Sequence, residues 1–156
     1  MIFNIIVTAV LVCIDQWSKY LATRYLIGNG TVVVIPHLLG LRYVENTGAA
    51  FSMLSNSTDF LIVVTAIALA VMAYMFWVKN YGDTFEKICF TLIIAGGIGN
   101  LIDRVLNGFV VDYFEFLFMD FAVFNVADVY VCTGIALYAV YTVYTEYYRK
   151  KRGNNG

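Results

Sequence analysis

The sequence has few charged residues for its length. Of 156 residues, 13% are charged and 61% are hydrophobic, whereas soluble globular domains average roughly 25% and 45–50%. Mean hydropathy is +0.75, so polar side chains are too few to cover a water-soluble core of this size. The composition predicts an integral membrane protein and excludes a disordered chain. The formal net charge of −1 leaves no broad basic surface, which argues against nucleic-acid binding.

Cysteine and histidine are also scarce. The three cysteines, Cys13, Cys89 and Cys132, lie in separate apolar runs and form no Cys-x-x-Cys pair. Neither a disulfide framework nor a zinc site is therefore expected, and we interpret the cysteines as small apolar residues packed in helices. The single histidine, His37, cannot form a metal site alone. The sequence predicts no metal site.

Four apolar segments are long enough to cross a membrane. They lie at about residues 2–26, 60–78, 86–104 and 125–147. A helix over the uncharged run 60–78 would be ~28 Å long, which matches a hydrocarbon core of about 30 Å. Each span is expected to be an α-helix, because lipid offers no partner to an unpaired backbone group. The fold class predicted is one all-α, four-span membrane domain over residues 1–156.

Basic residues cluster after the last span. They are Arg149, Lys150, Lys151 and Arg152. Because basic residues favour the cytoplasmic side, we expect the C-terminus in the cytoplasm, and four spans put the N-terminus there as well. The first span lacks a basic start and a small-residue cleavage site, so we expect it to be retained rather than cleaved as a signal peptide.

The outward connection between the first two spans, about residues 27–59, has strand-like stretches. Thr31–Ile35 is rich in β-branched residues and Leu41–Val44 is again apolar or aromatic, with Pro36 and Gly40 between them. Such runs bounded by turn residues are typical of short strands. We expect a small β-structure in this connection, on the membrane surface.

Charged side chains inside a span cost roughly 2.5–3.5 kcal/mol on insertion, so each needs a partner or a function. Asp15 and Lys19 lie four residues apart on one helix face. We interpret them as an ion pair that lowers the cost of both charges. Asp15 could also hold a neighbouring segment in place.

A second polar group ends the third span. Asn100, Asp103 and Arg104 share one helix face, and we interpret Asp103 as paired with Arg104 or another cation. Three glycines just before them permit close approach of another helix. They are Gly96, Gly97 and Gly99.

Further carboxylates lie near the start of the fourth span. Asp112 stands between apolar neighbours, where desolvation would raise its pKa, and Asn125 and Asp128 are spaced as helix caps. If Asp112 and Asp128 face each other, one keeps a proton while the other activates water, as in aspartic proteases. Spacing alone leaves Asp103 an equally good second carboxylate.

Two other functions stay open from the residues alone. One is a nucleophile formed by Ser52 and Lys19, which nothing in the sequence favours. The other is a small proton-coupled transporter, whose membrane carboxylates would carry protons. Transporters usually bind substrate near the midplane between repeats. Here the carboxylates gather toward one side and no repeat is visible, which argues against a transporter.

Five short stretches spread over nearly the whole chain resemble the motifs of bacterial lipoprotein signal peptidases (signal peptidase II), in the family's order. The stretches are Asp15–Lys19, Asn46–Phe51, Gly99–Arg104, Val110–Tyr113 and Phe124–Asp128. Each motif alone is weak, whereas five in order are specific.

The resemblance implies a four-span fold with a small extracytoplasmic β-cradle and a short outer helix. It implies a membrane aspartyl endopeptidase of the bacterial cell (inner or plasma) membrane, active toward the outer leaflet. The substrate implied is a diacylglyceryl-modified prolipoprotein, cut just before its lipidated cysteine, with membrane lipid around it. No cofactor and no obligatory protein partner are expected.

The motif positions also imply residue roles. The catalytic pair implied is Asp112 and Asp128. The supporting and substrate-contacting residues implied are Asp15, Asn46, Gly48, Asn100, Asp103, Arg104 and Asn125. The chain departs from the family at residues 121–123, where Phe-Ala-Val stands in place of the usual proline before the last motif.

Overall fold

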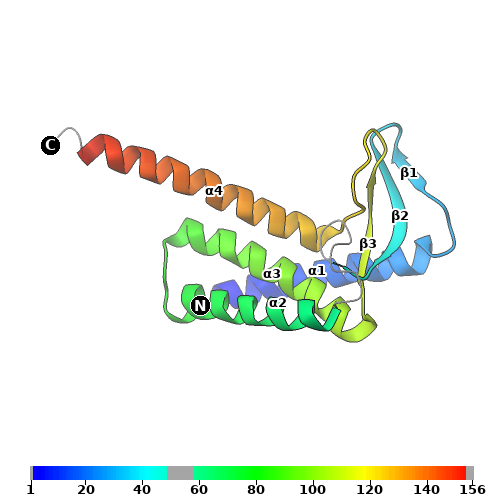
Figure 1. The fold of residues 1–156 in the computed structure, drawn as a ribbon, viewed down its shortest axis with the longest axis horizontal. Helices are drawn as coiled ribbons and strands as arrows, with labels where there is room; N and C mark the ends of the chain where they lie inside the picture. The colour runs from blue at the N-terminus through cyan, green and yellow to red at the C-terminus, as the bar shows by residue number, and fades with distance from the viewer. Residues whose placement is uncertain (1, 49–57, 154–156) are drawn as a thin grey trace.

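A computed structural model of the chain describes residues 2–48 and 58–153 (Figure 1). Within these residues, four helices are long and apolar enough to cross a membrane, as the sequence predicts. The helices are α1 (Ile2–Leu26), α2 (Thr58–Ala73) with its π-helical continuation η2 (Tyr74–Val78), α3 (Thr84–Asn107) and α4 (Val126–Gly153).

The helices carry much of their apolar surface on the outside. In α2 the only buried side chain is that of Leu69, whereas Phe60, Ile67 and Val71 are each more than half exposed. A water-soluble bundle would hide such residues, and an exposed apolar surface of this extent needs lipid to cover it. The chain is a multi-pass membrane protein.

Three antiparallel strands form a sheet in the order β1-β2-β3. Strands β1 (Val32–Ile35) and β2 (Leu39–Asn46) come from the connection between the first two spans, where β-structure is predicted. Strand β3 (Val110–Phe116) comes from the connection between the last two spans and is not predicted by our sequence analysis. Its first four residues are all buried, so β3 lacks the alternation of apolar and polar residues that marks a half-exposed strand.

The sheet rests on the C-terminal part of α1. Ala22 and Leu26 of α1 pack against Val111 and Tyr113 of β3 in one buried cluster. Figure 1 shows the sheet at one end of the helix bundle, whereas α1 begins and α4 ends toward the opposite end.

The short outer helix implied by the resemblance does not occur within residues 2–48 and 58–153. Residues 49–57, between the first two spans, lie outside the described part of the chain. They include the end of the second family-like motif and Ser52.

Helix α3 is the central helix of the bundle. It contacts α1, α2 and α4, and 39% of its most apolar stretch is buried, against 22% or less in the other spans. The predicted close approach occurs at its glycines: a Cβ on Gly96 would press on the Ala127 carbonyl oxygen, and one on Gly97 would meet Leu69. Small residues thus bring α4 and α2 against α3.

The interpretation of the cysteines is correct for Cys89, which is buried in α3, and wrong for Cys13 and Cys132, which are exposed. A thiol is nearly apolar, so a helix face that meets lipid accepts it as readily as a protein core does. An apolar run in a membrane protein therefore does not show which of its residues are packed.

Gly96→Ala should lower the melting temperature, because the added methyl group has no room between Ala127 and Val131. Overpacking of this kind costs about 1–3 kcal/mol. Gly30→Ala is the matched control, since a Cβ at Gly30 meets nothing within 4 Å. Thermal unfolding in detergent micelles compares the two. Equal melting temperatures would show that α3 and α4 can separate without cost.

Candidate active site

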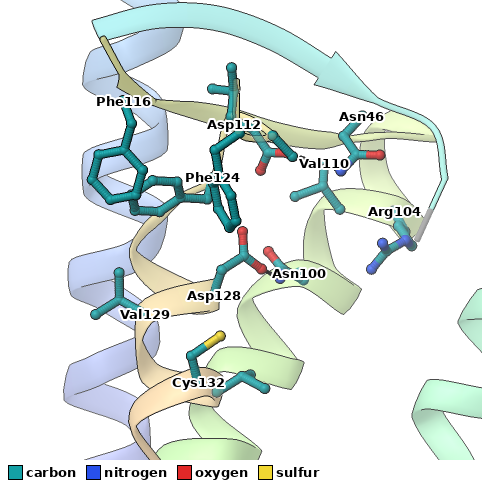
Figure 2. Close-up of a pocket in the computed structure, with 14 residues that line it drawn as sticks. Asn46, Asn100, Arg104, Val110, Asp112, Phe116, Phe124, Asp128, Val129 and Cys132 are labelled. Carbon is teal, nitrogen blue, oxygen red and sulfur yellow. Dashed lines mark hydrogen bonds between the residues drawn. The ribbon is translucent and has the colours of Figure 1, made fainter. Parts of the chain in front are cut away.

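The end of the sheet and the start of α4 bring Asp112 and Asp128 to one cavity. Asp112 lies on β3 and Asp128 in the first turn of α4. Both line a cavity of about 520 Å³, and Figure 2 shows their carboxyl groups pointing into the space between sheet and helix. Asn46, Asn100 and Arg104 line the same cavity.

Neutral N–H groups donate to every oxygen of these two carboxyl groups. Asp112 Oδ1 accepts from Asn125 Nδ2 at 2.6 Å and Oδ2 from Asn46 Nδ2 at 2.9 Å. Asp128 Oδ1 accepts from Asn100 Nδ2 at 2.8 Å and Oδ2 from the backbone N–H of Asn125 at 3.1 Å. Among the described residues, neither carboxyl group forms an ion pair. Their charge is solvated by dipoles and is not cancelled by a cation.

Burial raises the pKa of Asp112 to about 6. The nearby charge of Asp128 contributes to this raised pKa, whereas the hydrogen bonds from Asn46 and Asn125 lower it. Asp112 is only 2% exposed, so loss of hydration outweighs the two hydrogen bonds. A proton is therefore held at this site well above the usual range of a carboxylic acid.

Asn125 and Asp128 also cap α4, as their spacing predicts. Asn125 Oδ1 accepts the backbone N–H of Asp128 at 2.9 Å, and Asp128 Oδ2 accepts the backbone N–H of Asn125 at 3.1 Å. This reciprocal arrangement is a capping box. The cap fixes the Asp128 side chain through Oδ2, while Oδ1 is held by Asn100. Asp128 can therefore cap α4 and line the cavity at the same time.

Lys19 is the central cation of a buried network beside the cavity. Its ammonium lies 3.0 Å from Asp15 Oδ2 and 3.0 Å from Asp103 Oδ2, and it donates to Asn100 Oδ1 at 2.9 Å. The ion pair predicted with Asp15 is confirmed. The cation that pairs with Asp103 is Lys19 and not Arg104, because Lys19 reaches across from α1 to α3.

Asp103 differs from the two cavity carboxylates. Its Oδ1 accepts from Gln16 Nε2 at 2.9 Å, and its Oδ2 accepts the backbone N–H of Val111 at 3.0 Å in addition to the ion pair. Asp103 is 3% exposed, and both of its oxygens are occupied. This carboxylate joins α3 to α1 and to β3.

Asp15 holds a neighbouring segment in place, as its position suggests. Its Oδ1 accepts the backbone N–H of Ala127 at 2.9 Å, and that segment is the first turn of α4. Gln16, which our sequence analysis does not single out, donates to the carbonyl of Gly99 at 3.1 Å as well as to Asp103. The only sequence signal for Gln16 is its place inside the first family-like motif.

Arg104 and Asn46 hold the end of the β2 connection at the cavity. Arg104 Nη2 donates to the Gly48 carbonyl at 2.9 Å, and Asn46 Oδ1 accepts the backbone N–H of Gly48 at 3.0 Å. These bonds place Asn46 Nδ2 against Asp112. Ser52, the alternative nucleophile, lies outside the described residues.

The segment that lacks the family's proline still closes against β3. Phe124 and Phe114 exchange backbone hydrogen bonds, with Phe114 N–H donating at 2.7 Å and Phe124 N–H at 3.0 Å. The rings of Phe116 and Phe124 lie 5.1 Å apart, centre to centre. Strand pairing and aromatic contacts thus hold the segment in a position where it lines the cavity.

Comparison with known proteins identifies the family of this chain. The family model described as signal peptidase (SPase) II matches residues 7–144, a range that includes every site residue described above. The chain belongs to the signal peptidase II family. A lipoprotein signal peptidase of Caldanaerobacter subterraneus is 45% identical over 130 residues, which cover 83% of this chain and 88% of that protein.

Three further matches cover still more of the chain. A lipoprotein signal peptidase of Enterococcus faecalis is 38% identical over 152 residues, covering 97% of this chain and 93% of that protein. A solved bacterial membrane enzyme superimposes with a TM-score of 0.84 at 32% identity, over 92% of this chain and 88% of the other. A second gives a TM-score of 0.81 at 32% identity, over 91% and 93%.

Lys19→Met should destabilise the protein by about 3–5 kcal/mol, because Asp15 and Asp103 would remain buried without their cation. Lys150→Met is the matched control, since Lys150 is exposed near the end of α4. Thermal unfolding in detergent measures both variants. Equal stability of the two would show that the buried network does not hold the helices together.

Proposed function

We propose that this protein is a membrane aspartyl endopeptidase that removes the signal peptide from diacylglyceryl-modified prolipoproteins and cuts before the lipidated cysteine. Membership in the signal peptidase II family and relatives named lipoprotein signal peptidase support the substrate class. The observation that carries the chemistry is the pair Asp112 and Asp128, which share one cavity and receive only neutral hydrogen-bond donors.

Two carboxyl groups in one cavity resist ionising together, so the pair keeps one proton. Asp112 holds this proton, since its pKa is raised to about 6. Asp128, ionised, takes a proton from water, and the resulting hydroxide attacks the scissile carbonyl carbon. Asp112 donates its proton to the carbonyl oxygen as the tetrahedral intermediate forms. On collapse, Asp128 returns a proton to the leaving amine, and Asp112 regains its own from the hydroxyl.

Lys19 sets the orientation of the Asn100 side chain in this mechanism. A lysine can only donate, so the oxygen of Asn100 faces Lys19 and its NH₂ group faces Asp128. Asn125 Nδ2 adds a second donor to the same Asn100 oxygen at 3.1 Å. Asp128 is thereby held where it can face water in the cavity. We assign Asn46 and Asn125 to contact the substrate backbone, with Asp15, Asp103, Arg104 and Gly48 as supporting residues.

The place of the cavity in the bundle suits a lipidated substrate. It lies between the sheet and the adjoining helix ends, so water can enter while the acyl chains stay in lipid between the spans (Figure 2). Holding the lipid anchor fixes the scissile bond and reduces the entropic part of the barrier. The basic end of α4 lies away from the sheet, and its basic residues support a cytoplasmic position for it. The cavity then faces the outer leaflet of the cell membrane.

The alternative of a small proton-coupled transporter finds no support in the family match. The carboxylates of the site belong to one continuous network at the sheet end of the bundle. A transport path would need titratable groups along the span. The peptidase accounts for both the clustering and the family.

Asp112→Asn and Asp128→Asn should each lower kcat/KM by at least about a hundredfold, because each removes one half of the acid–base pair. Cleavage of a diacylglyceryl-modified precursor peptide measures the loss. Asp59→Asn is the control, since Asp59 is an exposed carboxylate in the first turn of α2.

Asp103→Asn should lower the stability of the fold more than it lowers the rate of the chemical step. If Asp103→Asn folded normally and were as inactive as the pair, Asp103 would replace one of them.

kcat/KM should fall as pH rises through about 6, because Asp112 then loses the proton that the mechanism requires. The sign follows from the raised pKa of Asp112: below it Asp112 holds its proton, and above it Asp112 is ionised. A pH series with one lipidated peptide, at pH values where the protein stays folded, measures this decline. A rate that rises through the same range would assign Asp112 the role of base.

A further inference from the structure

A second cavity adjoins the first at Asp112. Its volume is about 420 Å³, and it is lined by Arg42, Val44 and Glu45 of β2 and by residues 120–123 before α4. Asn46, Asp112 and residues 121–123 line both cavities. Asp112 therefore lies on the border between two spaces, and a bond cleaved beside it has one space on each side.

The two cavities differ in polarity. Away from Asp112, the first continues along α4 past Val129 and Cys132 and under the rings of Phe116 and Phe124 (Figure 2). The apolar lining of the second cavity is limited to Val44 and residues 121–123, which it shares with the first. The residues that line only the second cavity include the charged Arg42, Glu45 and Asp120. An apolar peptide segment in the second cavity would remove water from these charged groups and offer them no hydrogen bonds in return, which is unfavourable.

The charge of the second cavity is negative in balance. Arg42 Nε lies 3.0 Å from Glu115 Oε1, so its charge is already compensated within the sheet. Glu45 accepts a hydrogen bond from the Tyr43 hydroxyl at 3.2 Å and forms no ion pair within the described part of the chain. Asp120 likewise has no salt-bridge partner among residues 2–48 and 58–153. Two exposed carboxylates thus face the space without a cation.

We infer that the second cavity binds the hydrophilic segment that follows the lipidated cysteine of the substrate, and that it favours basic side chains in that segment. The inference rests on the proposed function. When the scissile bond lies beside Asp112, the substrate segments before and after that bond extend away from it in different directions. Its signal segment is apolar and matches the cavity along α4, whereas the segment after the cysteine is hydrophilic and matches Glu45 and Asp120. Specificity for that segment is then electrostatic.

The test uses two diacylglyceryl-modified precursor peptides that differ only in carrying lysine or glutamate at the second and third positions after the cysteine. The wild-type protein should give a kcat/KM roughly threefold to tenfold higher for the lysine peptide, the range expected of partly exposed charge pairs. The double variant Glu45→Gln/Asp120→Asn should bring this ratio close to one. Glu146→Gln, an exposed glutamate near the far end of α4, should leave it unchanged.

Three results would overturn the inference. The first is equal kcat/KM for the two peptides with the wild-type protein. The second is a preference that the double variant does not alter. The third needs a second pair of peptides that carry lysine or glutamate before the cysteine: a charge preference between them that the double variant removes would assign the cavity to the signal segment. If the wild-type protein cleaves neither peptide, the proposed function itself fails.

Salt provides a readout that does not depend on the variants. Exposed charges are screened over about 10 Å at 0.1 M ionic strength and about 3 Å at 1 M. The wild-type preference for the lysine peptide should therefore shrink as salt is raised. A preference that is constant over this range would contradict an electrostatic origin, even if the double variant failed to fold.

Discussion

The rest of the structure depends on the ion pairs that Lys19 forms with Asp15 and Asp103. A charge in a membrane span is costly unless it is compensated, and the ammonium of Lys19 compensates Asp15 and Asp103 at 3.0 Å each. Asp15 in turn binds the first turn of α4 through the Ala127 N–H, and Asp103 binds β3 through the Val111 N–H. One buried cation on α1 thereby fixes the elements that carry Asp112 and Asp128.

The same residue type takes two roles in this network because its surroundings differ. Asp15 and Asp103 form ion pairs with Lys19, and these pairs hold segments of the chain together. Asp112 and Asp128 receive only neutral donors and face an open cavity. Asn100 joins the two pairs, since its oxygen meets Lys19 and its NH₂ group meets Asp128. The Asn100 side chain thus lies between the ion pairs that stabilise the fold and the carboxyl pair proposed for catalysis.

The placement of the sheet explains why the site can have two differently lined cavities. Strands β2 and β3 pair so that Val44 lies opposite Asp112 and Asn46 opposite Val110. The apolar residues of α4 line the first cavity, the charged residues of β2 line the second, and Asp112 lines both. A substrate that is part membrane anchor and part hydrophilic chain meets a matching change of polarity at the proposed point of cleavage.

The sequence alone determined the membrane character, the four spans and the family, because composition, run length and ordered motifs are local properties of the chain. It also determined which polar residues share a helix face, since that follows from the helical period. It left β3 unpredicted, because the buried first half of this strand shows no alternation of apolar and polar residues, and it left open which cation pairs with Asp103. Only the tertiary structure decided these points and distinguished Asp103 from the cavity carboxylates. The contacts responsible, such as Asp15 with Ala127, join residues far apart in the chain, and no periodicity within one segment reports which segments meet.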